Sequence, residues 1–194
     1  MPANHAGARV LACALLFAQA LFAQALLEDE RNTIEVFEQV SPSVVFITGK
    51  AVQWDLFSRN VFEIPQGSGS GFVWDKNGHV VTNYHVIHKA DQVSVTLAGG
   101  ESYDAKLVGV APNKDLAVLK IDASAKTLFP IRTGSSRRLK VGRKVLAIGN
   151  PFGLDATVTV GVVSALQRGG FGIVSEDGEV GYEDFIQTDA AINP

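Results

Sequence analysis

The spacing of apolar positions changes along the chain, and each change predicts a different structure. Residues 10–27 are almost wholly apolar. Residues 32–40 then place three apolar side chains on one helical face, after an Asn-Thr-Ile-Glu sequence that fits a capping box with Asn32 as N-cap. From residue 44 onward, short apolar or alternating runs replace the helical spacing, which favours β-strands. We therefore expect one short N-terminal helix followed by strands.

The strand-like runs predict an antiparallel, all-β fold. They occupy residues 44–48, 69–74, 92–97, 102–110, 116–121, 145–148 and 157–163. Asn77-Gly78 and Gly99-Gly100 have the composition of hairpin turns. Short strands at regular spacing, without long helices between them, are typical of a sandwich or barrel. Residues 133–140 form a plausible linker between two β units, and the glycine-rich residues 167–182 predict a loop.

The apolar N-terminal segment predicts export from the cytoplasm. Arg9 precedes the apolar core, and an Ala-Gln-Ala sequence at residues 23–25 offers a small-x-small cleavage site. The alternative is an uncleaved anchor, through which the chain would associate with a membrane, although two Gln residues interrupt the run. We favour cleavage after Ala25. Cleavage would also remove Cys13, the single cysteine, and leave a mature chain without disulfides.

Composition and charge exclude several classes of function. The chain has 194 residues, of which 46% are apolar and 19% charged, and this balance excludes a disordered or coiled-coil protein. The formal net charge is −3. Basic residues cluster only in residues 137–144, a short stretch without aromatic residues, which we interpret as a solvated loop. We therefore expect no nucleic-acid partner.

Three histidines outside the N-terminal segment, His79, His85 and His88, are the first candidates for chemistry. Their spacing matches no HExxH pattern, and no cysteine would remain beside them, so we expect neither a metal site nor a cofactor. Taken alone, His85 fits a partly buried structural histidine, and Asp115 fits a turn cap before an apolar strand. Taken together, a His followed by an Asp on a β-rich chain is the order of the chymotrypsin-like enzymes, in which the Ser comes last.

Longer motifs make this interpretation more specific. Between about residues 33 and 194, the chain resembles the protease domain of the HtrA/Deg serine proteases. Its sequence motifs are most similar to those of the plant, algal and cyanobacterial branch. The matching motifs are the glycine run at 66–72, GHVVTNYHVI at 78–87, KDLAVLKI at 114–121, VLAIGNPFGL at 145–154, VTVGVVSA at 158–165 and IQTDAAINP at 186–194.

The resemblance implies a fold and an activity. The fold would be the chymotrypsin-like double β-barrel of the trypsin-like serine proteases, with a short N-terminal helix and an incomplete second barrel. The activity would be ATP-independent endoproteolysis of unfolded or damaged proteins, a form of protein quality control, by a homotrimer. The expected segments are a targeting segment at 1–25, a helix and arm at 26–43, a first barrel at 44–132, a linker at 133–140 and a partial second barrel at 141–194, with no PDZ domain. The compartment would be a thylakoid lumen or chloroplast in a photosynthetic eukaryote, and otherwise a periplasm or the secretory route.

The resemblance also assigns roles to residues. His85 would be the general base, Asp115 its orienting acid, and Ile192 a wall of the substrate pocket, while residues 167–182 would form a regulatory loop. The family continues Ile-Asn-Pro with Gly-Asn-Ser-Gly-Gly, so the nucleophile and its oxyanion hole are expected just beyond Pro194. A polypeptide ending there is expected to be inactive as a protease. Two alternatives stay open: an inactive protein that binds unfolded polypeptide or joins trimers, and a metal- or sugar-binding barrel, which the missing ligands disfavour.

Overall fold

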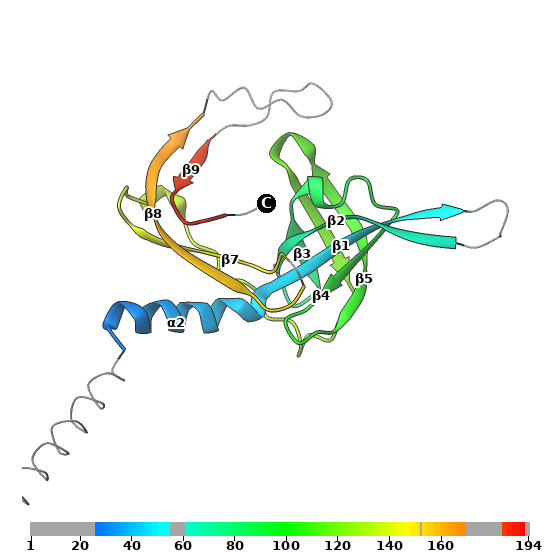
Figure 1. Ribbon diagram of the computed structural model, residues 1–194, viewed down its shortest axis with the longest axis horizontal. Coiled ribbons are helices and arrows are strands. Elements are labelled where there is room, and N and C mark those ends of the chain that lie inside the picture. The colour runs from blue at the N-terminus through cyan, green and yellow to red at the C-terminus, as the bar shows by residue number, and fades with distance from the viewer. Residues whose placement is uncertain (1–25, 55–60, 152, 170–183, 193–194) are drawn as a thin grey trace, which may run out of the picture. The chain divides into compact units, whose positions relative to one another are not determined.

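The computed structural model describes residues 26–54, 61–151, 153–169 and 184–192 (Figure 1). The chain forms two units, Met1–Val36 and Phe37–Pro194. The predicted targeting segment and most of the predicted loop at 167–182 lie outside the described residues. Among the described helices, none is long and apolar enough to cross a membrane.

The N-terminal helix α2 (Glu28–Val40) begins earlier than its sequence predicts. Asn32 lies inside the helix, so its prediction as N-cap is wrong. The first turn instead carries three acidic residues, whose charge stabilises the positive end of the helix dipole. One of them, Glu30, accepts a hydrogen bond from the backbone N–H of Leu27 through Oε2 at 2.8 Å. The helix ends before a short 3₁₀ turn, η1 (Ser41–Ser43), that contains Pro42.

A closed six-stranded antiparallel barrel follows and confirms the predicted all-β class (Figure 1). Around the barrel the strand order is β1-β2-β3-β6-β5-β4. Closure leaves each strand paired on both sides, which fixes the register of the strands that lead to the site. The strands are β1 (Val44–Trp54), β2 (Val61–Val73), β3 (His79–Thr82), β4 (Gln92–Thr96), β5 (Ser102–Ala111) and β6 (Leu116–Ile121).

Burial alternates along the barrel strands, even in β6, where all residues but Lys120 are apolar. In β6, Ala117, Leu119 and Ile121 are buried, whereas the residues between them face outward. In β3, Val80 is fully buried and packs into the same cluster. Because side chains alternate between the two faces of a strand, β3 and β6 are each anchored along one face by core packing.

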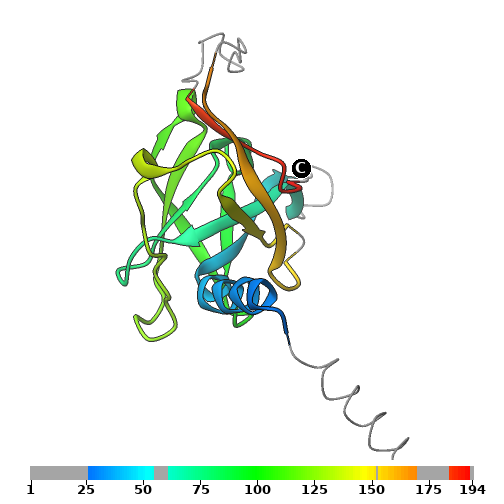
Figure 2. The same ribbon diagram turned by 90° about the vertical axis from the view of Figure 1, so that its left-hand side faces the viewer.

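The second half of the chain forms a three-stranded antiparallel sheet in the order β7-β8-β9. The strands are β7 (Lys144–Gly149), β8 (Thr157–Arg168) and β9 (Phe185–Thr188). Figure 2 shows β8 in orange beside β9 in red. Among the described residues of this half, the buried apolar side chains are those of Val163 and Ala190. This partial second sheet agrees with the expected incomplete second barrel.

Ser70 joins the barrel to the second sheet. Its Oγ accepts a hydrogen bond from the backbone N–H of Asn150 at 2.7 Å, and its carbonyl accepts one from Thr82 Oγ1 at 2.9 Å. A cavity of about 390 Å³ lies nearby, with Phe72 and Leu146 among its walls. Ser70 thus links the end of β3, where the candidate site begins, to the loop after β7.

Candidate active site

His85 lies in a short 3₁₀ turn, η2 (Tyr84–Val86), directly after β3. Thr82 at the end of β3 is buried, and so is Val86 after the histidine. These two anchors hold the turn against the barrel, while 69% of the His85 side chain stays exposed. The backbone bond from Ile87 N–H to the Tyr84 carbonyl, at 3.0 Å, closes the turn.

Asp115 reaches the same place from the other side of the β3–β6 pair. It follows the 3₁₀ turn η3 (Pro112–Lys114) and adopts a left-handed backbone conformation, with φ 50° and ψ 45°. Strands β3 and β6 pair with Thr82 opposite Ala117. The residues just after β3 therefore lie beside the residue just before β6, which brings together two side chains that are 30 positions apart.

The two predicted residues form a direct pair. His85 Nδ1 lies 2.6 Å from Asp115 Oδ2, and the His85 backbone N–H donates to Asp115 Oδ1 at 2.9 Å. An ionised carboxylate can only accept hydrogen bonds, so for a neutral imidazole this contact favours the tautomer with the proton on Nδ1 and the lone pair on Nε2. Within the described part of the chain, the hydrogen bonds of the His85 ring use Nδ1, and Nε2 is left available. This arrangement can accept a proton from a nucleophile.

The other two histidines have different surroundings. His88 Nδ1 lies 3.3 Å from the His85 carbonyl, and its ring packs at 5.5 Å against Tyr84. His79 belongs to the turn between β2 and β3. In the described ranges, no three His, Cys, Asp or Glu side chains gather in a way that could hold a metal ion.

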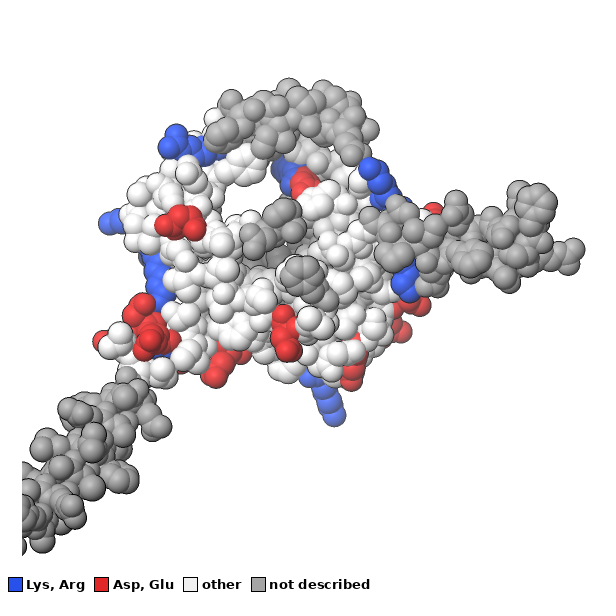
Figure 3. All heavy atoms as spheres, viewed as in Figure 1, with Lys and Arg blue, Asp and Glu red and all other residues white. Residues whose placement is uncertain are grey.

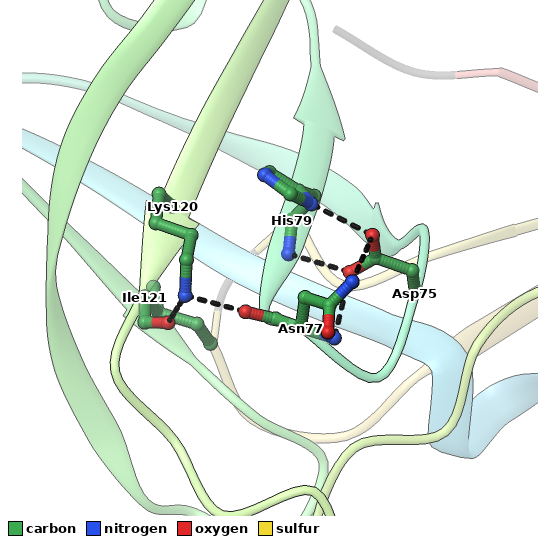
Figure 4. Close-up of polar contacts among 5 residues, drawn as sticks. All are labelled: Asp75, Asn77, His79, Lys120 and Ile121. Atoms are coloured by element: carbon green, nitrogen blue, oxygen red, sulfur yellow. Dashed lines mark hydrogen bonds and ion pairs between the residues drawn. The ribbon is translucent and has the colours of Figure 1, made fainter.

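Figure 4 shows a second His–Asp pair, which sequence reasoning missed. His79 Nδ1 lies 2.7 Å from Asp75 Oδ2, while Asp75 Oδ1 accepts the backbone N–H groups of Asn77 and His79 at 2.9 and 3.1 Å. These bonds, above all the one from the His79 side chain, hold the pKa of Asp75 at about 2. The sequence does carry a pattern from which this pair could have been predicted: an Asp four residues before a His, with an Asn-Gly turn between them.

The second pair braces a turn. Lys120 Nζ donates to the carbonyls of Asn77 and Ile121, and so ties the turn to the end of β6 (Figure 4). Both oxygens of Asp75 are engaged within its own turn. We therefore assign Asp75 and His79 a structural role.

Ile192, the third predicted site residue, is 71% exposed and follows β9. The residues before it are fixed to β8, because Asp189 Oδ1 accepts the Val162 N–H at 2.7 Å and the Ala191 carbonyl accepts Thr159 Oγ1 at 2.7 Å. Ile192 takes no part in the hydrogen bonds between His85 and Asp115. Its role in a substrate pocket stays a prediction.

A β-barrel that presents a His–Asp pair in this chain order belongs to the chymotrypsin-like class of proteins. Comparison with known proteins agrees, because the trypsin-like peptidase domain family matches residues 69–194. The chain belongs to this family as a homologue of the Deg/HtrA proteases.

Individual relatives make the placement specific. The chain is 56% identical over 169 residues to protease Do-like 1, chloroplastic, of Arabidopsis thaliana, and this match covers 87% of the chain and 38% of the relative. It is 52% identical over 126 residues to a probable periplasmic DegP-like serine endoprotease of Chlamydia muridarum, covering 65% of the chain and 24% of that relative. The crystal structure of Deg5 superposes with a TM-score of 0.68 at 43% identity, covering 87% of this chain and 77% of that one. The chain thus spans well under half the length of these two curated relatives.

Proposed function

We propose that this chain carries the proton-accepting part of an HtrA/Deg-type serine endopeptidase, which degrades unfolded or damaged proteins without ATP. The observation that carries the proposal is the 2.6 Å contact between His85 Nδ1 and Asp115 Oδ2. The names of the relatives, one a Do-like protease and the other a probable periplasmic DegP-like serine endoprotease, support the same activity.

The proposed mechanism uses each residue of the pair once. His85 Nε2 takes the proton from a serine Oγ as that oxygen attacks the scissile carbonyl, and it later gives the proton to the leaving amine. Asp115 holds the imidazole in the correct tautomer and stabilises the imidazolium that forms. No cofactor is needed for these steps.

The resemblance places the serine three positions after Pro194. The backbone N–H groups of that serine and of its preceding glycine would form the oxyanion hole, in which one donor is worth about 10²–10³ in rate. A polypeptide that stops at Pro194 would have neither group. We therefore propose that residues 1–194, expressed alone, do not hydrolyse protein.

Surface character supports unfolded polypeptide as the substrate. On the face shown in Figure 3, most of the described surface belongs to uncharged residues, although some charged side chains lie within the face as well as at its margins. The second sheet exposes Val160, Val162 and Ile186, which could contact apolar segments of an unfolded chain. We propose that Ile192 lines the pocket for the residue before the scissile bond, and that the active form is a homotrimer.

The proposed location is extracytoplasmic or chloroplastic. Relatives are named as chloroplastic proteases in Arabidopsis thaliana and as probable periplasmic proteases in bacteria. Residues 1–25 have the composition of an export segment, which supports delivery to such a compartment.

A chimera tests the proposed activity. Residues 26–194 are joined to the part of protease Do-like 1 that follows the matching position, so that a serine and oxyanion hole are supplied. The chimera is expected to cleave an unfolded protein such as reduced casein, and His85→Ala is expected to lower kcat/KM by about 10⁴-fold or more. The readout is the initial rate of peptide release.

His79→Ala is the matched control, because His79 also contacts an aspartate through Nδ1. If the His79→Ala chimera folds, it is expected to cleave casein as the parent chimera does. Cleavage that survives in the His85→Ala chimera would contradict the proposal. A folded chimera that binds casein without cleaving it would instead favour the alternative of an inactive binding protein.

A further inference from the structure

Asn83, two positions before His85, makes two contacts that the mechanism above does not use. Its side-chain Nδ2 donates to the Asp115 carbonyl at 3.1 Å and to the Asp115 Oδ2 at 3.1 Å. One amide group thus holds both the main chain and the side chain of the acidic residue.

The position of Asn83 makes these contacts informative. Asn83 is the N-cap residue of η2, where asparagine side chains ordinarily accept a hydrogen bond from their own turn. Here no such capping bond forms, and the backbone of Asn83 is extended, with φ −79° and ψ 145°. The side chain is turned away from its own turn and across to Asp115 instead.

The backbone of Asp115 needs support of this kind. A left-handed conformation is uncommon outside glycine, although Asp adopts it more readily than most residues. The Asp115 carbonyl accepts the Tyr84 N–H at 3.2 Å as well as the Asn83 amide, and its own N–H donates to Pro112. Neighbours on both sides therefore hold the unusual conformation that aims the carboxylate at His85.

We propose that Asn83 is a positioning residue, which fixes the Asp115 carboxylate so that Oδ2 stays in line with His85 Nδ1. As a statement about catalysis, this inference rests on the proposed protease function. Asp115 Oδ1 is held by a backbone N–H, whereas Oδ2 is held by the imidazole and by the Asn83 amide. The imidazole is the group that changes charge and moves during the reaction, so the amide is the fixed partner of Oδ2.

The experiment measures the geometry of the pair without requiring hydrolysis. In the ¹⁵N-labelled full chain, the imidazole signals of His85 report its tautomer and the downfield Nδ1 proton reports the bond to Asp115. We expect the Nδ1-protonated tautomer and a resolved downfield proton in the unaltered chain. We expect Asn83→Ala to shift that proton upfield or abolish it, and to introduce the Nε2-protonated tautomer.

Asn113→Ala is the matched control, because Asn113 is an exposed asparagine that lies in the turn just before Asp115. This variant should leave the His85 signals unchanged. Asn83→Asp keeps the size of the side chain but removes the donor, so it should lose the downfield Nδ1 proton of His85 as Asn83→Ala does. Asn83→Gln keeps the amide and should retain part of that signal. If Asn83→Ala and Asn83→Asp both fold and leave the Nδ1 proton and the tautomer unchanged, the proposal is wrong.

Two further measurements keep the outcomes distinct. In the unaltered chain, an Asn83 side-chain proton is expected to exchange with water more slowly than those of Asn113, and equal rates would overturn the proposal even if no variant folded. In the chimera described above, Asn83→Ala is expected to lower kcat by up to about 10²-fold with little change in KM. A change in the His85 signals together with an inactive parent chimera would contradict the proposed function and leave the positioning role intact.

Discussion

Two aspartates in this chain each contact a histidine Nδ1, and their different settings give them different roles. Asp75 contacts His79 within a single turn, four residues away. Asp115 contacts His85 from 30 positions away, across the β3–β6 pair. The local pair closes the turn between two strands. The distant pair leaves Nε2 of its histidine directed away from the aspartate, where a reacting group can reach it.

The pH dependence of stability is expected to differ between the parent chain and the Asp75→Asn variant, which lacks the carboxylate of the local pair. The pKa of Asp75 is about 2 in the folded chain, below its ordinary value of 3.8, because the His79 side chain donates to it. Since the folded-state pKa is lowered, the ionised group stabilises the fold above about pH 4, and this contribution is lost as the pH falls towards 2. Asp75→Asn should therefore lower the urea midpoint at pH 6, and the deficit should shrink between pH 4 and pH 2.

The control for this prediction is Asp122→Asn, which makes the same change in charge at an exposed residue just after β6. It should change the urea midpoint less than Asp75→Asn at pH 6. A deficit for Asp75→Asn that stays constant from pH 6 to pH 2 would contradict the assigned cause.

At the scale of the element, the hairpin between β2 and β3 depends on one glycine. Gly78 has φ +90°, and a Cβ built on it would lie 2.3 Å from the Ile121 carbonyl oxygen. Gly100, in the turn between β4 and β5, has a similar φ of +84° but open space around it. Substitutions at the two positions therefore distinguish two costs in folding free energy: that of a side chain on a left-handed backbone, and that of a steric clash with Ile121.

Replacing each of these glycines by alanine gives a direct comparison. Gly100→Ala is expected to cost about 1–2 kcal/mol in free energy of unfolding, through its left-handed backbone alone. Gly78→Ala is expected to cost about 1–3 kcal/mol more, because the β2–β3 turn must move away from Ile121. Equilibrium urea unfolding of both variants measures the difference. Equal losses of unfolding free energy in the two variants would contradict this prediction, because they would mean that the β2–β3 turn moves away from Ile121 at no cost.

Sequence patterns located the strands better than they located the element ends. The apolar run at residues 116–121 was predicted as a strand with the bounds that the structure has, and its burial alternates from residue to residue. Strands β1 and β2 extend beyond their predicted ends, to Trp54 and back to Val61, through residues that do not alternate. The start of α2 was misplaced because its acidic first turn, rather than an Asn cap, satisfies the helix end.

The candidate site was only partly predictable for a related reason. His85 and Asp115 could be selected from chain order and from motifs, and the structure places them in contact. The contribution of Asn83 depends on the β3–β6 register and on the left-handed backbone of Asp115, both set by tertiary pairing. Neither has a local pattern in the sequence.

Across the whole molecule, stability is expected to be uneven. The core cluster of the first barrel contains many fully buried apolar side chains, whereas β7 to β9 are mostly half-buried or exposed. Amide hydrogen exchange should therefore be at least about tenfold slower in β3 and β6 than in β9. Mass spectrometry of exchanged peptides at neutral pH measures these rates. Uniform protection across both halves would contradict this expectation.

The closed barrel also fixes the order in which the site can be assembled during synthesis. Its strands run from Val44 to Ile121, and both His85 and Asp115 lie within this stretch. At about 5–20 residues per second, a ribosome needs several seconds to add the next 70 residues. The barrel can fold during this interval, because all of its strand partners have already been made. A nascent chain would thus be able to bring His85 and Asp115 together before the last strand of the second sheet, β9, has been made.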